Sequence, residues 1–242
     1  MIQVGFKSDR GLKRKNNEDS CFVIPEDKIY IVADGVGGSK SGEVASRSAV
    51  SFVADYVKKN PIKATNGREE LKNYFINCVE QANQLIYGLA NEDENNKGMA
   101  TTLVLAYINR RRAYVVNIGD SRAYLMRDNQ LTQITEDHTY VNTLLKTGAI
   151  TEEDAKSHEK KHIITRALGG DSAVEPDIFE VKLIKDDILL LCTDGLHGEV
   201  ADDNICEILS SGNPMSEICN MLITKANRSG GNDNITVVCV KI

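Results

Sequence analysis

Short apolar runs alternate with polar turns along much of the chain. Seven runs rich in Val, Ile and Tyr are bounded by Gly, Asp or Asn, a pattern typical of β-strands. These predicted strands cover residues 20–24, 29–33, 102–108, 113–118, 123–127, 188–192 and 235–242. Polar connections at 109–112 and 119–122 predict a meander of antiparallel hairpins, and Asp128-Asn129 predicts one further turn.

Helical periodicity marks three segments. Apolar residues recur at three- and four-residue spacing over 45–57 and 71–89, and a shorter stripe covers 218–226. Because strands cluster as hairpins and helices come in blocks, the pattern favours an α+β fold with largely antiparallel sheet. The polar, Lys/Glu-rich stretch 140–161 is predicted to form a mobile helical excursion on the surface.

The domain organisation is predicted to be simple. No linker rich in Pro, Gly or Ser divides the chain, and no internal repeat or low-complexity tract is visible. The 242 residues are enough to bury a sizeable core. Residues 1–242 are therefore predicted to form a single domain with the excursion at 140–161.

Composition excludes several classes of protein. Hydrophobic residues make up 41% and charged residues 26%, the usual globular balance. No apolar run approaches the roughly 18–20 residues of a membrane span, and the N-terminus lacks the pattern of a secretory signal. The six cysteines are far apart with no Cys-x-x-Cys pair, which indicates buried, reduced thiols. We therefore expect a cytoplasmic protein that does not bind membranes.

The net charge of −6, from 29 basic and 35 acidic residues, argues against nucleic-acid binding. The run Arg110-Arg111-Arg112 is too short for a basic stripe and is typical of a hairpin tip. An acidic excess gathered in a cleft would instead attract metal ions.

Four aspartates lie at the ends of predicted strands. Asp34-Gly35, Asp120 and Asp194-Gly195 each follow an apolar run, whereas Asp233-Asn234 opens the last one. Carboxylates fixed at one end of a sheet suit Mg²⁺ or Mn²⁺, and they would repel one another unless cations neutralised them. One Asp-Gly pair alone is explained by a turn, but four acidic strand ends favour a metal site.

The motifs in their order resemble one family. They are Ser8-Asp9-Arg10-Gly11, Arg14-Lys15-Asn16-Asn17-Glu18-Asp19-Ser20, Ala33-Asp34-Gly35-Val36-Gly37-Gly38, Gly42-Glu43-Val44-Ala45-Ser46, Gly98-Met99-Ala100-Thr101-Thr102, Asn117-Ile118-Gly119-Asp120-Ser121-Arg122, Leu131-Thr132 before Asp137-His138, Thr165-Arg166-Ala167-Leu168-Gly169, Cys192-Thr193-Asp194-Gly195-Leu196 and Gly230-Gly231-Asn232-Asp233-Asn234-Ile235-Thr236. From about Gly5 to the C-terminus, the chain resembles the metal-dependent type 2C Ser/Thr protein phosphatases (the PPM family), and most of all its compact bacterial members.

The resemblance implies a four-layer α-β-β-α sandwich, in which two packed antiparallel sheets are flanked by helices and the metals lie in a cleft at one end. The excursion at 140–161 lies where the family has its flap, and we expect it to tune the choice of substrate.

The resemblance also implies the metal ligands. Asp34 matches the carboxylate that bridges two ions, and Gly35 matches a carbonyl ligand. Asp194 and Asp233 match the aspartates that complete the shell of one ion. Asp120 with Asp194 matches the third-ion site of bacterial relatives, although Asp120 in Gly-Asp-Ser-Arg could equally cap a tight turn. The implied cofactors are two core Mn²⁺ or Mg²⁺ ions, with a third at Asp120.

Three further residues receive roles from the resemblance. Arg14 matches the arginine that binds the substrate phosphate, although an isolated Arg is usually a solvated surface residue. Glu18 and Asp19 match acidic residues that act near the metals through bound water, and Asp19 could instead simply begin a hairpin.

The implied reaction is direct hydrolysis of phosphoserine or phosphothreonine. Two ions sharing a water lower its pKa, and the resulting hydroxide attacks phosphorus in line with the leaving oxygen. No phosphoenzyme is expected, so Cys192 is not a nucleophile. The implied partners are phosphoproteins and an opposing bacterial Ser/Thr kinase, and the chain is expected to be a monomer.

One position departs from the family pattern. Many eukaryotic relatives carry a histidine, a proposed general acid, after Asp-Gly, whereas this chain has Val36. We hypothesise that a metal-bound water protonates the leaving group, with His138 and His197 as the side chains whose replacement tests this.

Other interpretations are weaker. The loop from Gly35 to Gly42 lacks the Gly-Lys-Ser/Thr ending of a nucleotide cradle, and its glycines are expected to let backbone pass close to the metals. His158 and His162 have a zinc-binding spacing but lysine-rich, solvated surroundings. The alternative function is a catalytically silent regulator that binds phosphoproteins, and a third is a phosphatase acting on an anti-sigma antagonist.

Overall fold

The computed structural model describes residues 2–37, 41–63 and 66–242. Gly38, Ser39 and Lys40, which belong to the loop predicted to pass near the metals, lie outside the described residues.

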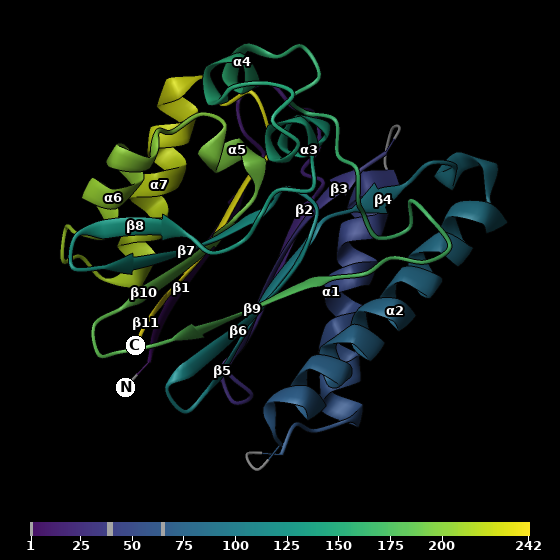
Figure 1. Cartoon of the computed structure of the whole chain (residues 1–242), viewed down its shortest axis with the longest axis horizontal. Helices are drawn as coiled ribbons and strands as arrows, with labels where there is room; N and C mark the ends of the chain where they lie inside the picture. Colours follow the sequence, from purple (N-terminus) through teal and green to yellow (C-terminus); the bar gives the residue numbers. More distant parts are fainter. Residues whose placement is uncertain (1, 38–40, 64–65) are drawn as a thin grey trace.

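Eleven strands form two antiparallel sheets in the described part of the chain (Figure 1). The first sheet has the order β1-β11-β10-β7-β8. Its strands are β1 (Gln3–Asp9), β7 (Arg122–Arg127), β8 (Gln130–Gln133), β10 (Ile188–Cys192) and β11 (Ile235–Lys241). The second has the order β2-β3-β5-β6-β9, and β4 pairs with the end of β3. Its strands are β2 (Asp19–Ile24), β3 (Ile29–Val36), β4 (Ala100–Thr101), β5 (Leu103–Asn109), β6 (Arg112–Ile118) and β9 (Asp177–Lys182).

Helices cover the outer face of each sheet. The long helices α1 (Ser41–Lys59) and α2 (Arg68–Glu92) pack on the second sheet, and α2 is followed by the short 3-10 helix η1 (Glu94–Asn96). Helices α5 (Asp194–His197), α6 (Asp202–Leu209) and α7 (Met215–Ser229) pack on the first. The result is the expected α-β-β-α sandwich, with α3 (Tyr140–Lys146) and α4 (Glu152–Ser157) at one end and both termini at the other (Figure 1).

Alternation along the strands separates the core into layers. In β3, Ile29 and Ile31 face α1 and α2, whereas Tyr30 and Val32 belong to the cluster between the sheets. Successive strand residues point to opposite faces, so Asp34, two residues after Val32, continues the face between the sheets.

The layer between the sheets changes from apolar to polar at the end of the sandwich that carries Asp34. Here the strand positions that continue the inward-facing apolar residues are buried but hydrophilic: Asp19, Thr102, Asn117, Thr193 and Thr236. Buried polar groups need hydrogen-bond partners, so this end of the sandwich must contain a network.

The predicted elements are confirmed with two kinds of correction. The connection 119–122 is not a hairpin, because β6 pairs with β5 and β9 while β7 pairs with β10 and β8. It instead carries the chain from one sheet to the other. Strands β1 and β9 and helices α5 and α6 were absent from the prediction. Both strands are edge strands whose residues are mostly half-buried or exposed.

The excursion at 140–161 contains α3 and α4, which is the predicted helical content. No helix among the described residues combines the length and the apolar character that a membrane crossing needs.

Candidate active site

Two carboxylates face each other across β2 and β3. Asp19 and Asp34 are direct partners in the antiparallel register, and like charges directly opposite are destabilising. Burial raises the pKa of Asp34 well above its ordinary value, and the charges of Asp19, Asp194, Asp120 and Asp233 add to this. The predicted carboxylates are therefore brought together from both sheets.

Asp194 is the first residue of α5, directly after β10. Its Oδ1 is buried and has no hydrogen-bond partner. Burial and the charge of Asp233 raise its pKa, while hydrogen bonding with Asp34 and the positive charges of His162 and Arg14 oppose the rise. A buried carboxylate oxygen without a partner is the kind of atom that a cation satisfies.

Asp19 is held by the opposite sheet. Its side chain is 6% exposed, and Thr193 donates to its Oδ2 at 2.8 Å, whereas its Oδ1 is buried without a partner. Burial raises the pKa of Asp19 to about 7. It is thus both a strand residue and a member of the cluster, rather than only the start of a hairpin.

Asp120 lies in the crossover between β6 and β7 and is 6% exposed. The Gly119 amide donates to Nδ1 of His138 at 3.0 Å, and the His197 ring donates from Nε2 to the Asp120 carbonyl at 3.0 Å. Burial, helped by the charge of Asp194, raises the pKa of Asp120 to about 7. The carboxyl is therefore directed toward the cluster by a turn that other elements hold.

Gly35 occupies a crowded backbone crossing. A Cβ there would lie 2.0 Å from the carbonyl oxygen of Gly42 and 2.6 Å from that of Glu18. The Gly35 amide donates to the Glu18 carbonyl at 3.1 Å. Only glycine fits at this crossing of the backbone with Gly42 and Glu18.

Glu18 lies beside this crossing. Its side-chain Oε2 would be 2.5 Å from a Cβ at Gly42. Burial raises the pKa of Glu18, and Arg14 opposes the rise. Glu18 is thus close to both the cluster and the arginine.

Arg14 and Asp233 are paired at the rim. The guanidinium donates to Oδ2 of Asp233 at 2.6 Å, and 54% of the Arg14 side chain is exposed. This hydrogen bond, with attraction by Asp194 and Asp34, raises the pKa of Arg14. The arginine is therefore a permanent cation, open to solvent, next to the carboxylates.

Asn234 anchors the loop that carries Arg14. Its Nδ2 donates to the carbonyls of Arg10 and Asn16, each at 2.8 Å, and its Oδ1 accepts from the Glu18 amide at 2.7 Å. No local pattern around Asn234 predicts these contacts, because their partners lie more than 200 residues away in the chain. A buried amide can bind two carbonyls and one amide group at once, which explains an Asn immediately after a site aspartate.

The donor set fits divalent cations. It consists of hard oxygen ligands, includes unpartnered buried oxygens at Asp19 and Asp194, and carries more negative charge than Arg14 offsets. Among the described residues, no group of three or more His, Cys, Asp or Glu side chains could by itself hold a metal ion. Mg²⁺ commonly takes only one or two carboxylates and keeps several waters, so an open, water-rich centre matches these residues better than a closed cage.

His138, which is buried, and His197, which is half-buried, are both held by hydrogen bonds. His138 accepts at Nδ1 and pairs through Nε2 with Asp177 at 3.1 Å. Burial lowers the pKa of His138 and lowers that of His197 to about 3. Both rings hydrogen-bond to the backbone of the Asp120 turn, and His138 also bonds to Asp177.

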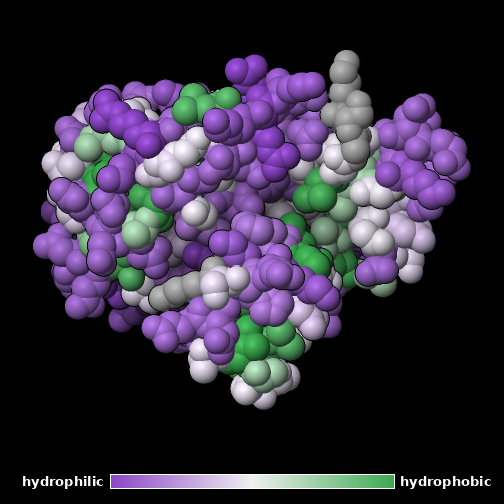
Figure 2. All heavy atoms as spheres, turned by 90° about the horizontal axis from the view of Figure 1, so that it is seen from above, coloured by the Kyte–Doolittle hydropathy of each residue, from purple (hydrophilic) through white to green (hydrophobic). Residues whose placement is uncertain are grey.

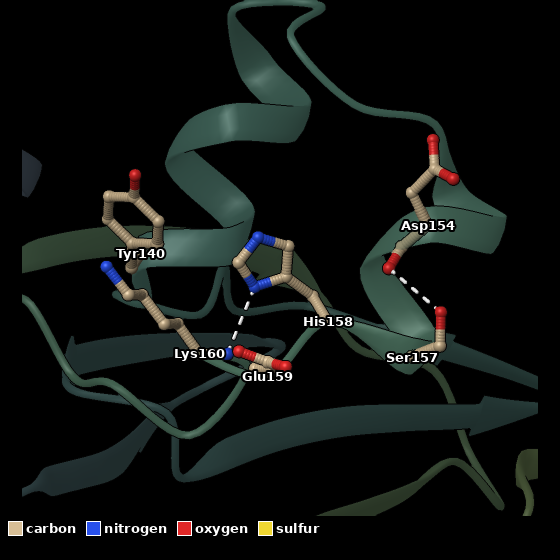
Figure 3. Close-up of a pocket in the computed structure, with 6 residues that line it drawn as sticks. All are labelled: Tyr140, Asp154, Ser157, His158, Glu159 and Lys160. Atoms are coloured by element: carbon tan, nitrogen blue, oxygen red, sulfur yellow. Dashed lines mark hydrogen bonds between the residues drawn. The ribbon is translucent and has the colours of Figure 1, made fainter.

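The flap contains a separate open pocket of about 530 Å³ (Figure 3). It is lined by Tyr140, Asp154, Ser157, His158, Glu159 and Lys160. Nζ of Lys160 lies 5.4 Å from the centre of the Tyr140 ring. The surface seen from this end is mostly hydrophilic (Figure 2).

The histidine pair of the flap does not form a zinc site. Helix α4 ends at Ser157, so His158 and His162 do not share a helix. Nδ1 of His158 instead accepts from the Lys160 amide at 3.0 Å. His162 is exposed but lies close enough to Asp194 to influence its pKa, where the sequence predicted only a solvated residue.

An α-β-β-α sandwich with carboxylates and an exposed arginine at one end defines a candidate phosphate-ester hydrolase. The family model described as protein phosphatase 2C matches residues 12–228. The serine/threonine phosphatase stp of Listeria welshimeri is 42% identical over 244 residues, covering 99% of this chain and 96% of that protein.

Solved structures agree with this assignment. The Mycobacterium tuberculosis serine/threonine phosphatase PstP/Ppp has a TM-score of 0.91 and 38% identity, covering 100% of this chain and 98% of that one. A structure of the PstP catalytic domain in complex with two manganese ions has a TM-score of 0.87 and 38% identity, covering 99% and 97%. The chain belongs to the protein phosphatase 2C family, and it is a serine/threonine protein phosphatase whose substrates are phosphoproteins.

Proposed function

We propose that this chain hydrolyses phosphoserine and phosphothreonine directly, with Mn²⁺ or Mg²⁺ held by Asp34, Gly35, Asp194 and Asp233. The observation that carries the proposal is the gathering of carboxylates from both sheets, with Asp19 directly opposite Asp34 and with buried, unpartnered oxygens on Asp19 and Asp194. The two manganese ions in the PstP complex support the choice of metal. When bound, such ions supply an activated water and charge stabilisation for phosphoryl transfer.

The chain's own residues have distinct proposed roles. The Asp34 carboxylate, at the centre of the cluster, would help to hold both core ions, and Asp120 with Asp194 would hold a third. Glu18 and Asp19 would orient water beside them. Arg14 holds the substrate phosphate because its fork of N–H donors matches phosphate oxygens.

In this proposal no side chain protonates the leaving group, and water held at a bound metal centre would supply the proton. His138 and His197 are occupied by hydrogen bonds to the Asp120 turn and to Asp177, and Val36 carries no proton. Replacement of either histidine is therefore expected to act through the turn, without removing any limb of the pH–rate profile.

The biological setting follows from the same proposal. A Ser/Thr kinase produces the phosphoproteins, the phosphatase acts in the cytoplasm as a monomer, and residues 1–242 form one domain. The flap, residues 140–161, selects among phosphoproteins through its exposed side chains.

The test is hydrolysis of a phosphothreonine peptide with Mn²⁺, Mg²⁺ or EDTA. We expect phosphate release with Mn²⁺ or Mg²⁺, none with EDTA, and a loss of about 10³-fold or more in Asp34→Asn, which keeps the shape but removes the charge. Asp187→Asn is the control, because Asp187 is equally a buried aspartate but pairs with Arg127 at 2.7 Å. Release that EDTA leaves unchanged would contradict the proposal.

A further inference from the structure

Thr102 lies between two segments that carry site carboxylates. It is fully buried, at 0% exposure, and its Oγ1 accepts from the Asp34 amide at 2.8 Å. The same oxygen is 2.7 Å from Oγ of Ser121, the residue directly after Asp120. One hydroxyl therefore joins the end of β3 to the crossover that leads into the other sheet.

The Thr102 hydroxyl can make both of these hydrogen bonds at once. A threonine hydroxyl has one proton and two acceptor sites. Thr102 Oγ1 uses one acceptor site for the Asp34 amide, and either hydroxyl can be the donor in its bond with Ser121 Oγ. The Thr102 amide also donates to the Asp34 carbonyl at 2.8 Å, so Thr102 fixes both backbone polar groups of Asp34.

The methyl group of Thr102 makes a second contact with the crossover. Gly119 has a φ of +99°, and a Cβ there would lie 2.6 Å from Cγ2 of Thr102. The methyl group of Thr102 thus packs against Gly119, the residue before Asp120, and its hydroxyl bonds to Ser121, the residue after Asp120. Ser121 is fully buried, at 0% exposure, so loss of the hydroxyl leaves both partners without solvent to replace it.

We propose that Thr102 is a positioning residue that sets the separation of Asp34 and Asp120 and thereby the affinity of the cluster for divalent ions. The inference rests on the proposed function, in which both aspartates bind ions. Outer hydrogen-bond partners of metal ligands typically change affinity by about 10–100-fold when removed.

The experiment compares Thr102→Val and Thr102→Ser in the full chain. Valine keeps the shape and removes the hydroxyl, whereas serine keeps the hydroxyl. Calorimetric titration of Mn²⁺ into metal-free protein should show affinity lowered about 10-fold or more in Thr102→Val and largely retained in Thr102→Ser. The Mn²⁺ concentration for half-maximal aryl phosphate hydrolysis should shift in parallel.

Thr135→Val is the matched control. Thr135 is also buried, at 3% exposure, and its hydroxyl accepts from the Ala123 amide at 3.1 Å, but it bonds neither Asp34 nor a residue next to Asp120. Its replacement should lower the thermal unfolding temperature without changing Mn²⁺ affinity. Ser121→Ala removes only the hydrogen bond between Ser121 and Thr102, so it should weaken Mn²⁺ binding less than Thr102→Val does. It replaces Thr102→Val in the test if that variant does not fold.

The outcomes separate the two proposals. If the wild-type chain binds Mn²⁺ but Thr102→Val or, where that variant is unfolded, Ser121→Ala binds it equally well, the positioning role is wrong and the proposed function stands. Equal weakening in Thr102→Ser and Thr102→Val would assign the effect to packing and also overturn the role of the hydroxyl. Absence of Mn²⁺ binding in the wild-type chain would overturn both.

Discussion

At the carboxylate end of the sandwich, buried hydrogen bonds join residues far apart in the chain, whereas the flap is held by contacts between near neighbours. Thr193 reaches Asp19 across 174 positions, and Asn234 reaches Glu18 across 216. In the flap, Thr151 and Asp154 cap α4 across three positions. The positions of the site carboxylates thus depend on the whole fold. The flap, in contrast, can change its sequence and structure without disturbing distant residues.

Among the variants that test this contrast, we expect the largest loss of activity at Arg14, on the rim of the carboxylate cluster. Arg14→Ala should lower kcat/KM for a phosphopeptide by about 10–100-fold, because a hydrogen bond to a charged group contributes roughly 1.5–3 kcal/mol. The kcat/KM of Arg14→Lys should lie between those of the wild type and Arg14→Ala, since an ammonium keeps the charge but lacks the bidentate fork of a guanidinium.

Steady-state kinetics with Arg10→Ala as the control measures this effect. Arg10 is exposed in the same loop and donates to the Lys15 carbonyl at the long distance of 3.5 Å. Equal losses in the two variants would mean that Arg14 matters only for the loop.

A smaller, substrate-dependent effect is expected in the flap. Residues 140–161 can be replaced by a short Gly-rich linker, because Thr139 already forms a β-bridge with Ile164. Discrimination between two phosphopeptides should change several-fold, while kcat/KM for a small aryl phosphate should change little.

The control for this deletion is Thr151→Ala, which removes the capping box of α4 and costs about 1 kcal/mol of local stability. It should shift discrimination in the same direction but less. If the deletion reduces peptide and aryl phosphate turnover by the same factor, the flap serves the chemistry and the contrast fails.

The smallest effect concerns the stability of metal-free protein. Burial raises the pKa of Asp19 and Asp120 to about 7 from 3.8, so the folded chain binds protons that the unfolded chain has released. Stability must then fall as pH rises through about 7. Thermal unfolding in EDTA should occur a few degrees lower at pH 8 than at pH 6.5.

The range from pH 6.5 to pH 8 lies above the titration of the two histidine rings at the Asp120 turn. Because the pKa values of His138 and His197 are lowered in the folded chain, these residues reduce stability as pH falls below 6.5, which is the opposite trend. Saturating Mn²⁺ should remove the trend, because ions bind the deprotonated carboxylates. Asp120→Asn should reduce it. A rise in unfolding temperature from pH 6.5 to pH 8 in EDTA would show that the carboxylates are already ionised.

The sequence predicted the strands that contain a continuous apolar run, and it missed two edge strands that do not. Residues 188–192 were predicted without error and are all buried. The edge strands β1 and β9 are mostly half-buried or exposed, so they lack the continuous apolar run on which the prediction relied.

The same distinction applies to the site. Asp34, Asp120 and Asp194 follow apolar runs, so their places at strand ends were predictable from local pattern. The roles of Thr102, Thr193 and Asn234 were not, because their partners lie elsewhere in the chain. The connection 119–122 has the length of a hairpin turn, and only the pairing of β6 and β7 with different strands reveals the crossover.

The pairing of β1 with β11 has a consequence for synthesis. Among the described residues, residues 3–9 pair in the sheet only with residues 235–241, so β1 stays unpaired until β11 has been synthesised. Such non-local closure is slow and leaves an open strand edge on the nascent chain. Asp233 lies just before β11, so a growing polypeptide lacks its full set of site carboxylates until this distant segment has been synthesised.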